Sequence, residues 1–235
     1  MFSYPRQSEF NRVVPKSKIY AHAKPGKAVK DHFVSDIGEI VWKYKLSPET
    51  INLPSRQGIG EIQVFDLALK TGALHPAVLR AIDQAIPFPI LFQLSHGDRV
   101  RFAASWKRPS EADPGKWVIE ASFLTPWQPE ALERPPLPVA LDLASLYEQL
   151  VRQHLSLPPR PAESLRNQVG RFLAIESKEK ACQQLEARLS RENQFNRKVE
   201  LNSALRACRA DLAILQSPES SPPPAAHGQT KAAQP

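Results

Sequence analysis

Residues 163–216 contain no proline and a single glycine, although the 235-residue chain carries 23 prolines and 9 glycines. Proline and glycine are the residues that most often end a helix, so this segment is predicted to be helical. In its second half, apolar residues recur along one helical face: Leu201, Leu205, Cys208, Leu212 and Leu215. The first half carries a looser stripe of the same kind: Leu165, Val169, Phe172, Ile175, Cys182, Leu185 and Leu189.

A polar run at 190–197 separates the two stripes. A single straight helix over this segment would extend for about 80 Å. A hairpin that turns near 193–196 would instead let each half bury its stripe against the other, and we expect the hairpin. In that arrangement Cys182 and Cys208 face each other as small apolar core residues. The single long helix remains the alternative.

The first ~125 residues contain enough large apolar side chains for a core, and we expect them to form an α+β domain. Segment 61–69 is a mostly apolar run between glycines, and segment 117–124 alternates apolar with polar residues, as strands do. The expected elements are an entry arm over 1–15, helices over 16–24, 27–46 and 75–86, and strands over 61–69, 90–94, 99–107 and 117–124. Strands joined by short turns predict an antiparallel sheet with the helices on one face.

Clusters of proline divide the rest of the chain. We expect an α+β domain over 1–127, a proline-rich linker over 128–138, a helix over 139–157, a second linker over 158–162, the helical hairpin over 163–216 and a tail over 217–235. The tail lacks large apolar residues and cannot offset the entropy of its own ordering, so it is predicted to be disordered.

Several functional classes lack their sequence signals. The two cysteines have no paired spacing, which argues against a disulfide scaffold and a zinc ribbon. No window approaches the ~18 apolar residues of a membrane span, and the N-terminus has no apolar leader. We therefore expect a cytoplasmic protein with no membrane association, no cofactor and no metal.

Catalytic signatures are equally weak. A metal-dependent nuclease would need paired acids followed by a lysine, and the nearest candidates are Asp66, Asp98 and Glu120. Lys70 follows Asp66, but Ala68 stands where the second acid is needed. No histidine pair has the spacing of a zinc protease, and neither cysteine lies in a nucleophile motif. A degenerate nuclease therefore stays an alternative, and we expect no catalytic residue.

A basic patch is the stronger signal. Residues 1–45 hold nine lysines and arginines against four acids, which accounts for +5 of the chain's net charge of +7. Basic residues near tyrosines suit nucleic acid, although a solvated lysine-rich face has the same composition. The candidate nucleic-acid-binding residues are Arg12, Lys16, Lys18, Lys24, Lys27 and Lys30.

Four segments carry a resemblance to a known family: 9–20 (EFNRVVPKSKIY), 37–50 (IGEIVWKYKLSPET), 61–65 (EIQVF) and 194–202 (QFNRKVELN). Together they resemble the uncharacterised bacterial family called domain of unknown function 4391, over nearly the whole chain up to about Ser217. The family has no established catalytic role, so the resemblance transfers no functional residue.

Proteins of this family tend to be encoded beside DNA methyltransferases and helicases. The resemblance therefore implies a non-enzymatic accessory or adaptor subunit of a bacterial DNA-modification or phage-defence complex, which binds a methyltransferase or helicase and in addition DNA. A stand-alone DNA-binding protein is the further alternative. The hairpin is the expected docking element, and it also suits self-association into a homo-oligomer. Its candidate partner-binding residues are Phe195, Arg197, Lys198, Leu201 and Leu205.

Overall fold

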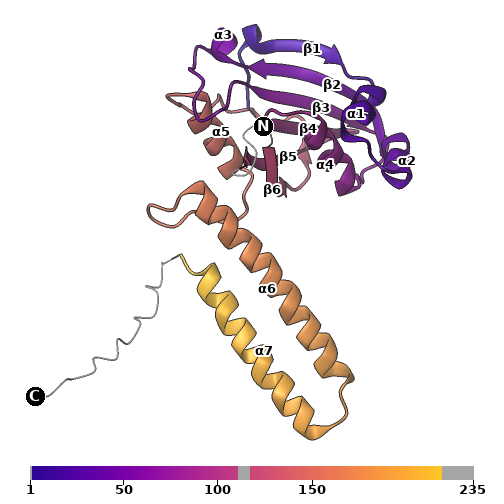
Figure 1. The fold of residues 1–235 in the computed structure, drawn as a ribbon, viewed down its shortest axis with the longest axis vertical. Helices are drawn as coiled ribbons and strands as arrows, with labels where there is room; N and C mark the ends of the chain where they lie inside the picture. The colour runs from indigo at the N-terminus through magenta and orange to yellow at the C-terminus, as the bar shows by residue number, and fades with distance from the viewer. Residues whose placement is uncertain (1, 111–116, 219–235) are drawn as a thin grey trace, which may run out of the picture. The chain divides into compact units, whose positions relative to one another are not determined.

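The computed structural model describes residues 2–110 and 117–218 (Figure 1). The chain divides into two compact units, Met1–Ser156 and Leu157–Pro235. The first is an α+β unit and the second is a helical hairpin, which confirms the predicted fold class. From residue 219 onward the tail predicted over 217–235 lies outside the described residues.

The N-terminal unit is built on a seven-stranded sheet. Its strands are β1 (Glu9–Val13), β2 (Ile37–Leu46), β3 (Ile62–Leu69), β4 (Ile90–His96), β5 (Arg99–Pro109), β6 (Trp117–Leu124) and β7 (Gln128–Pro129). The first six lie side by side in chain order, and β7 pairs with β5. Every pair is antiparallel except β3 and β4, which are parallel. Strands β3 and β4 can run parallel because helix α4 (Pro76–Ala85) connects them. The helix returns the chain from the end of β3 to the side of the sheet where β3 begins.

Two predictions near the N-terminus were wrong. The helix predicted over 27–46 ends early: α2 spans Lys27–Asp36, and strand β2 begins at Ile37. The apolar residues of 37–46 fit helical spacing, but their β-branched and aromatic side chains favour a strand once partners exist on both sides. Those partners are β3 and β1, and β1 itself lies in the segment predicted to be an entry arm.

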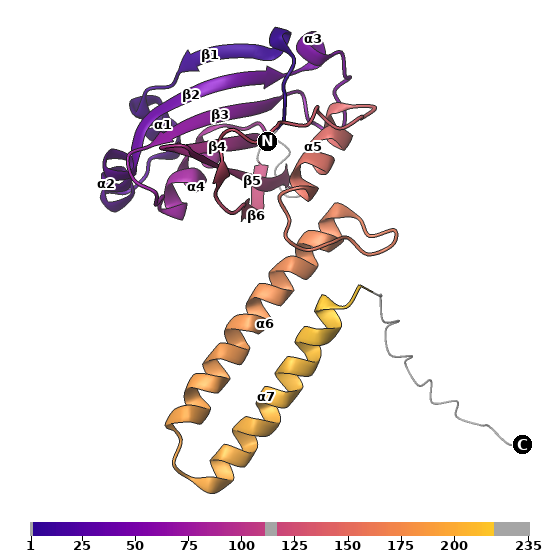
Figure 2. The ribbon, with the colours of Figure 1, turned by 180° about the vertical axis from the view of Figure 1, so that it is seen from behind.

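Helices α1 (Lys16–Ala23), α2 and α4 cover one face of the sheet (Figure 2). Their buried residues join those of the strands in one core, which includes Ile19, Phe33, Phe65, Leu67, Val78, Ile82 and Phe92. Helix α1 ends where Lys24 adopts a left-handed conformation, with φ of 47°. The short helix α3 (Pro48–Ile51) follows β2 and is capped by Ser47. A 3-10 turn, Arg6–Ser8, precedes β1.

Helix α5 (Leu143–Arg152) lies against the other side of β5. The Trp106 ring stacks on Tyr147 with centroids 5.5 Å apart, and the Tyr147 hydroxyl accepts a hydrogen bond from the Lys107 backbone at 2.9 Å. The helix predicted over 139–157 begins only at Leu143, because the Asp142 side chain caps it by accepting from the Ser145 backbone at 2.7 Å.

The C-terminal unit is the predicted hairpin. Helices α6 (Leu165–Arg191) and α7 (Phe195–Gln216) run antiparallel, joined by residues 192–194. Cys182, Leu205 and Cys208 are buried together, with Leu185 and Leu189 packed against them. This confirms that the two apolar stripes bury each other and that the cysteines serve as core residues. No helix in the described part of the chain is long and apolar enough to cross a membrane.

Candidate functional site

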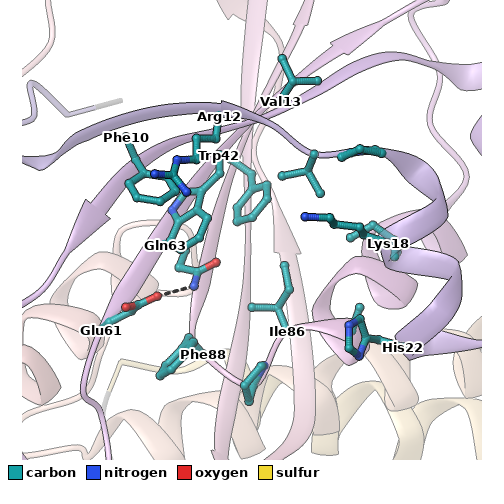
Figure 3. Close-up of a pocket in the computed structure, with 16 residues that line it drawn as sticks. Phe10, Arg12, Val13, Lys18, His22, Trp42, Glu61, Gln63, Ile86 and Phe88 are labelled. Carbon is teal, nitrogen blue, oxygen red and sulfur yellow. Dashed lines mark hydrogen bonds between the residues drawn. The ribbon is translucent and has the colours of Figure 1, made fainter.

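A pocket of about 550 Å³ opens in the N-terminal unit beside β1 and α1 (Figure 3). Strands β1, β2 and β3 and the residues next to them contribute one part of its lining, α1 another, and residues 85–88, at the end of α4 and just after it, the remainder. Two of the predicted basic residues, Arg12 and Lys18, line it. The pocket therefore gathers part of the predicted basic patch around a defined cavity.

Aromatic rings form the strand side of this pocket. Phe10 lies against Trp42 with ring centroids 4.1 Å apart, and Trp42 stacks nearly parallel to Phe65 at 6.1 Å. The Trp42 indole Nε1 donates to the backbone oxygen of Tyr44 at 2.9 Å, which fixes the ring orientation. The Arg12 guanidinium lies 4.4 Å from the centroid of the Phe10 ring, a cation–π arrangement. A stack of this kind offers a π-surface next to a positive charge.

The opposite rim carries charge and apolar surface. Lys18 and His22 are one helical turn apart on α1, and both are exposed. Figure 3 shows them across the pocket from Phe10 and Arg12, with Ile86 and Phe88 below.

One acidic side chain, that of Glu61, lines the pocket, and Lys45 neutralises its charge. Glu61 accepts a hydrogen bond from the Gln63 side chain and pairs with the Lys45 ammonium at 3.3 Å. Both Glu61 and Gln63 are buried, at 8% and 4% exposure. The remaining charges of the lining, on Arg12 and Lys18, are exposed and positive, so the pocket favours an anionic ligand.

The other four predicted basic residues have different positions. Lys16 donates from Nζ to the backbone oxygens of Phe33 and Ile37, both at 2.7 Å, and so caps the end of α2. Burial, followed by the nearby Lys70, lowers the pKa of Lys16.

The remaining three, Lys24, Lys27 and Lys30, are exposed and do not line the pocket. The Lys30 ammonium lies 5.6 Å from the Tyr20 ring centroid. The structure thus brings Arg12 and Lys18 together and leaves the others along α1 and α2.

The predicted partner-binding residues are distributed over both sides of α7. Phe195, Arg197 and Lys198 are exposed, with Phe195 at 78%. Leu201 is half-buried, and Leu205 is buried within the hairpin's own core. Val199, four residues after Phe195, is 53% exposed. The exposed apolar surface at the start of α7 therefore consists of Phe195 and Val199 beside two cations.

The candidate nuclease acids do not gather. Asp66 lies on β3, Asp98 in the turn between β4 and β5, and Glu120 on β6, where it pairs with Arg108. Within residues 2–110 and 117–218, no group of three histidine, cysteine, aspartate or glutamate side chains is arranged to hold a metal ion.

Sequence reasoning missed several pocket residues: Phe10, His22, Glu61, Gln63 and Phe88. A signal for some of them exists in the sequence, because Phe10 with Arg12, and Glu61 with Gln63 and Phe65, have the two-residue spacing of one strand face. For Phe10 and Arg12 the signal is usable only when β1 is known to be a strand, whereas segment 61–69 is already predicted as one from the sequence.

The fold and the pocket define a two-unit protein, in which an α+β unit with a basic, aromatic-lined cavity precedes an antiparallel helical pair. Residues 2–212 match the family described as Domain of unknown function (DUF4391), and the chain belongs to this family. The chain matches none of the curated proteins and none of the solved structures.

Proposed function

We propose that this protein is a non-enzymatic adaptor of a bacterial DNA-modification or defence complex, which contacts single-stranded nucleic acid through the pocket beside β1 and α1. The observation that carries the proposal is the position of Arg12 and Lys18 at the rim of an aromatic cavity. In the same proposal, the hairpin docks a protein partner, a DNA methyltransferase or helicase.

The pocket suits an unstacked base with its phosphate. The Phe10–Trp42 stack and Phe88 supply π-surface, and base stacking on aromatic side chains contributes ~1–3 kcal/mol per base. Arg12 and Lys18 lie where a flanking phosphate would be neutralised. Because a base can enter only after leaving a duplex stack, single strands are the expected ligands.

The hairpin presents an apolar surface that its own packing leaves uncovered. Phe195 and Val199 are one turn apart at the start of α7, and Arg197 and Lys198 flank them. Apolar anchors beside cations are typical of interface residues, with aromatic residues enriched among those that dominate binding. An acidic helical surface on the partner would be complementary.

The nucleic-acid contact is tested by fluorescence anisotropy of labelled 15-nucleotide DNA, single-stranded and duplex, over a salt series. We expect preference for the single strand, a Kd that rises steeply with salt, and at least tenfold weaker binding by the Arg12→Ala/Lys18→Ala variant. No salt-dependent binding would refute this part of the proposal.

A matched double variant, Lys24→Ala/Lys27→Ala, removes the same charge from residues outside the pocket. We expect it to weaken binding less than threefold. If both double variants weaken binding equally, a diffuse lysine-rich face is responsible and the pocket is not the contact site. Trp42→Phe keeps an aromatic ring and should retain most of the affinity.

The docking proposal is tested by affinity purification from the native host. The full chain should recover a DNA methyltransferase or helicase, and Phe195→Asp/Val199→Asp should not. Arg206→Ala, an exposed change elsewhere on α7, serves as the control that retains the partner. Recovery of the same partner by the Asp double variant would place docking elsewhere.

A further inference from the structure

A second pocket lies on the opposite face of the sheet. Phe65 faces the pocket beside β1, and the next residue along β3, Asp66, faces this one, since successive strand residues alternate in direction. The second pocket has a volume of about 330 Å³. Its polar lining consists of Lys43, Tyr44, Asp66, Gln93, Ser95 and Arg134 along with Glu130.

Strand register places a carboxylate beside a carboxamide in this pocket. Asp66 on β3 and Gln93 on β4 are direct partners in the parallel pair, so their side chains lie next to each other on one face. Gln93 is only 5% exposed. Ser95 follows two residues later on the same face.

Three polar atoms of this pair lack a hydrogen-bond partner. Among the described residues, Asp66 Oδ1 and both the oxygen and the nitrogen of the Gln93 amide are buried without one. Burial raises the pKa of Asp66, and Lys43 and then Arg134 act against that rise. Buried polar side chains are almost always paired, so three such atoms at one pocket wall indicate a polar ligand.

The pair specifies the chemistry of that ligand. A carboxylate such as that of Asp66 can accept two hydrogen bonds side by side, and the neighbouring Gln93 amide can donate one from Nε2. The pairing edge of guanine offers N1–H and N2–H as adjacent donors, followed by the O6 acceptor, and so complements both groups. The adenine edge has a single donor beside a ring-nitrogen acceptor and would satisfy only one of the two carboxylate oxygens.

Two cations lie beside the wall that Asp66 and Gln93 form. Lys43 and Arg134 line the same pocket, together with the acids Asp66 and Glu130. With Asp66 taking the base, the two cations can pair with a phosphate of the same ligand. The volume of about 330 Å³ lies at the lower end of small-molecule sites, which suits a mononucleotide. We propose that the Asp66–Gln93 pocket binds a guanine mononucleotide.

The test is isothermal titration of the full chain with GMP, AMP, guanosine and inorganic phosphate. We expect GMP to bind at least tenfold more tightly than AMP, and guanosine and phosphate to bind more weakly than GMP. Equal affinity for GMP and AMP, binding of phosphate as tight as that of GMP, or no heat with GMP would overturn the proposal and leave a pocket that holds water only.

Two variants keep the test independent of folding. Asp66→Asn preserves shape but not charge, and it should abolish the preference for GMP while thermal unfolding shows the protein folded. Asp31→Asn, an exposed acid on α2, should leave binding unchanged. GMP preference that survives in Asp66→Asn would refute the assigned role.

The Arg12→Ala/Lys18→Ala variant separates this site from the first pocket. It should retain GMP binding even where single-stranded DNA binding is lost. Loss of GMP binding in that variant would place the nucleotide beside β1 and α1 and overturn the assignment.

Discussion

Arg171 forms a two-pronged ion pair with Glu163, in which Nε and Nη2 of the guanidinium donate to the two carboxylate oxygens at 2.9 and 2.8 Å. Both side chains are buried, at 5% and 8% exposure. The same guanidinium donates to the backbone oxygens of Pro158 at 2.7 Å and Leu215 at 3.3 Å. Arg171 therefore connects the segment before α6 to the C-terminal end of α7, at the end of the hairpin opposite its turn.

Replacing Arg171 by methionine should destabilise the hairpin. The change removes the guanidinium that pairs with the buried Glu163 carboxylate, and losing one member of a buried ion pair costs about 3 kcal/mol. Urea unfolding of the full chain followed by circular dichroism at 222 nm should show a lower midpoint. Tryptophan fluorescence should be unchanged, because all four tryptophans lie within the first 156 residues.

The control for this change is another ion pair of the same hairpin. Lys178 and Asp211 are 2.7 Å apart but exposed, at 40% and 54%. Exposed pairs contribute little because solvent screens them, so Lys178→Met should not move the circular dichroism midpoint. An equal shift in both variants would mean that helix propensity, and not the buried pair, governs the result.

The hairpin should also lose stability in acid. Hydrogen bonds from Arg171 are the largest cause of the lowered pKa of Glu163. A carboxyl group whose pKa falls on folding adds stability above its unfolded pKa, about 4.3, and loses it as the pH drops through the folded value. Thermal melts between pH 7 and pH 3 should therefore converge for wild type and Glu163→Gln as the pH falls. A constant difference would contradict the linkage.

A buried lysine anchors α4 to the sheet. Lys107, at 1% exposure, lies 2.9 Å from the Asp83 carboxylate and donates to the backbone oxygens of Asp83, Ile86 and Phe88. Burial raises the pKa of Asp83 and lowers that of Lys107. Lys107→Met should destabilise the N-terminal unit by about 3 kcal/mol, measured by tryptophan fluorescence in urea.

Two further variants show whether the charge pair with Asp83 or the carbonyl contacts of Lys107 account for that loss of stability. Lys107→Met/Asp83→Leu removes both charges and should recover part of the loss, because no unpaired buried charge remains. Lys70→Met removes an exposed lysine that also donates to a helix carbonyl, that of Val34, and should change stability by less than about 0.5 kcal/mol. If the double variant is no more stable than Lys107→Met, the carbonyl contacts dominate.

The two cysteines should be unreactive in the native protein. The hydrogen bond with Cys208, followed by burial, raises the pKa of the Cys182 thiol to about 11. At pH 8 about one such thiol in a thousand is then ionised, and the thiolate is the reactive form. Labelling with a thiol-specific disulfide reagent should be slow in buffer and fast in guanidinium. Fast labelling in buffer would show that the hairpin opens.

Much of the fold could be predicted because the elements concerned carry a clear local pattern. Strands β3 and β6 have strand composition and alternation within their own residues, and α6 and α7 have long apolar stripes without proline. The site could not be predicted to the same degree. Arg12 and Lys18 stand in the basic segment of the sequence, but nothing local shows that they border the Trp42 ring or that Lys16 is used to cap α2.

The sequence by itself determined the α+β class, the hairpin, the excess positive charge at the N-terminus and the family resemblance, because each depends on composition or on spacing within one segment. Only the tertiary structure decided that 37–46 is a strand and that residues 9–13 pair with it. It also decided that Asp66 meets Gln93. Pairing across a sheet joins residues far apart in the chain, and its free energy depends on neighbours that no local periodicity specifies.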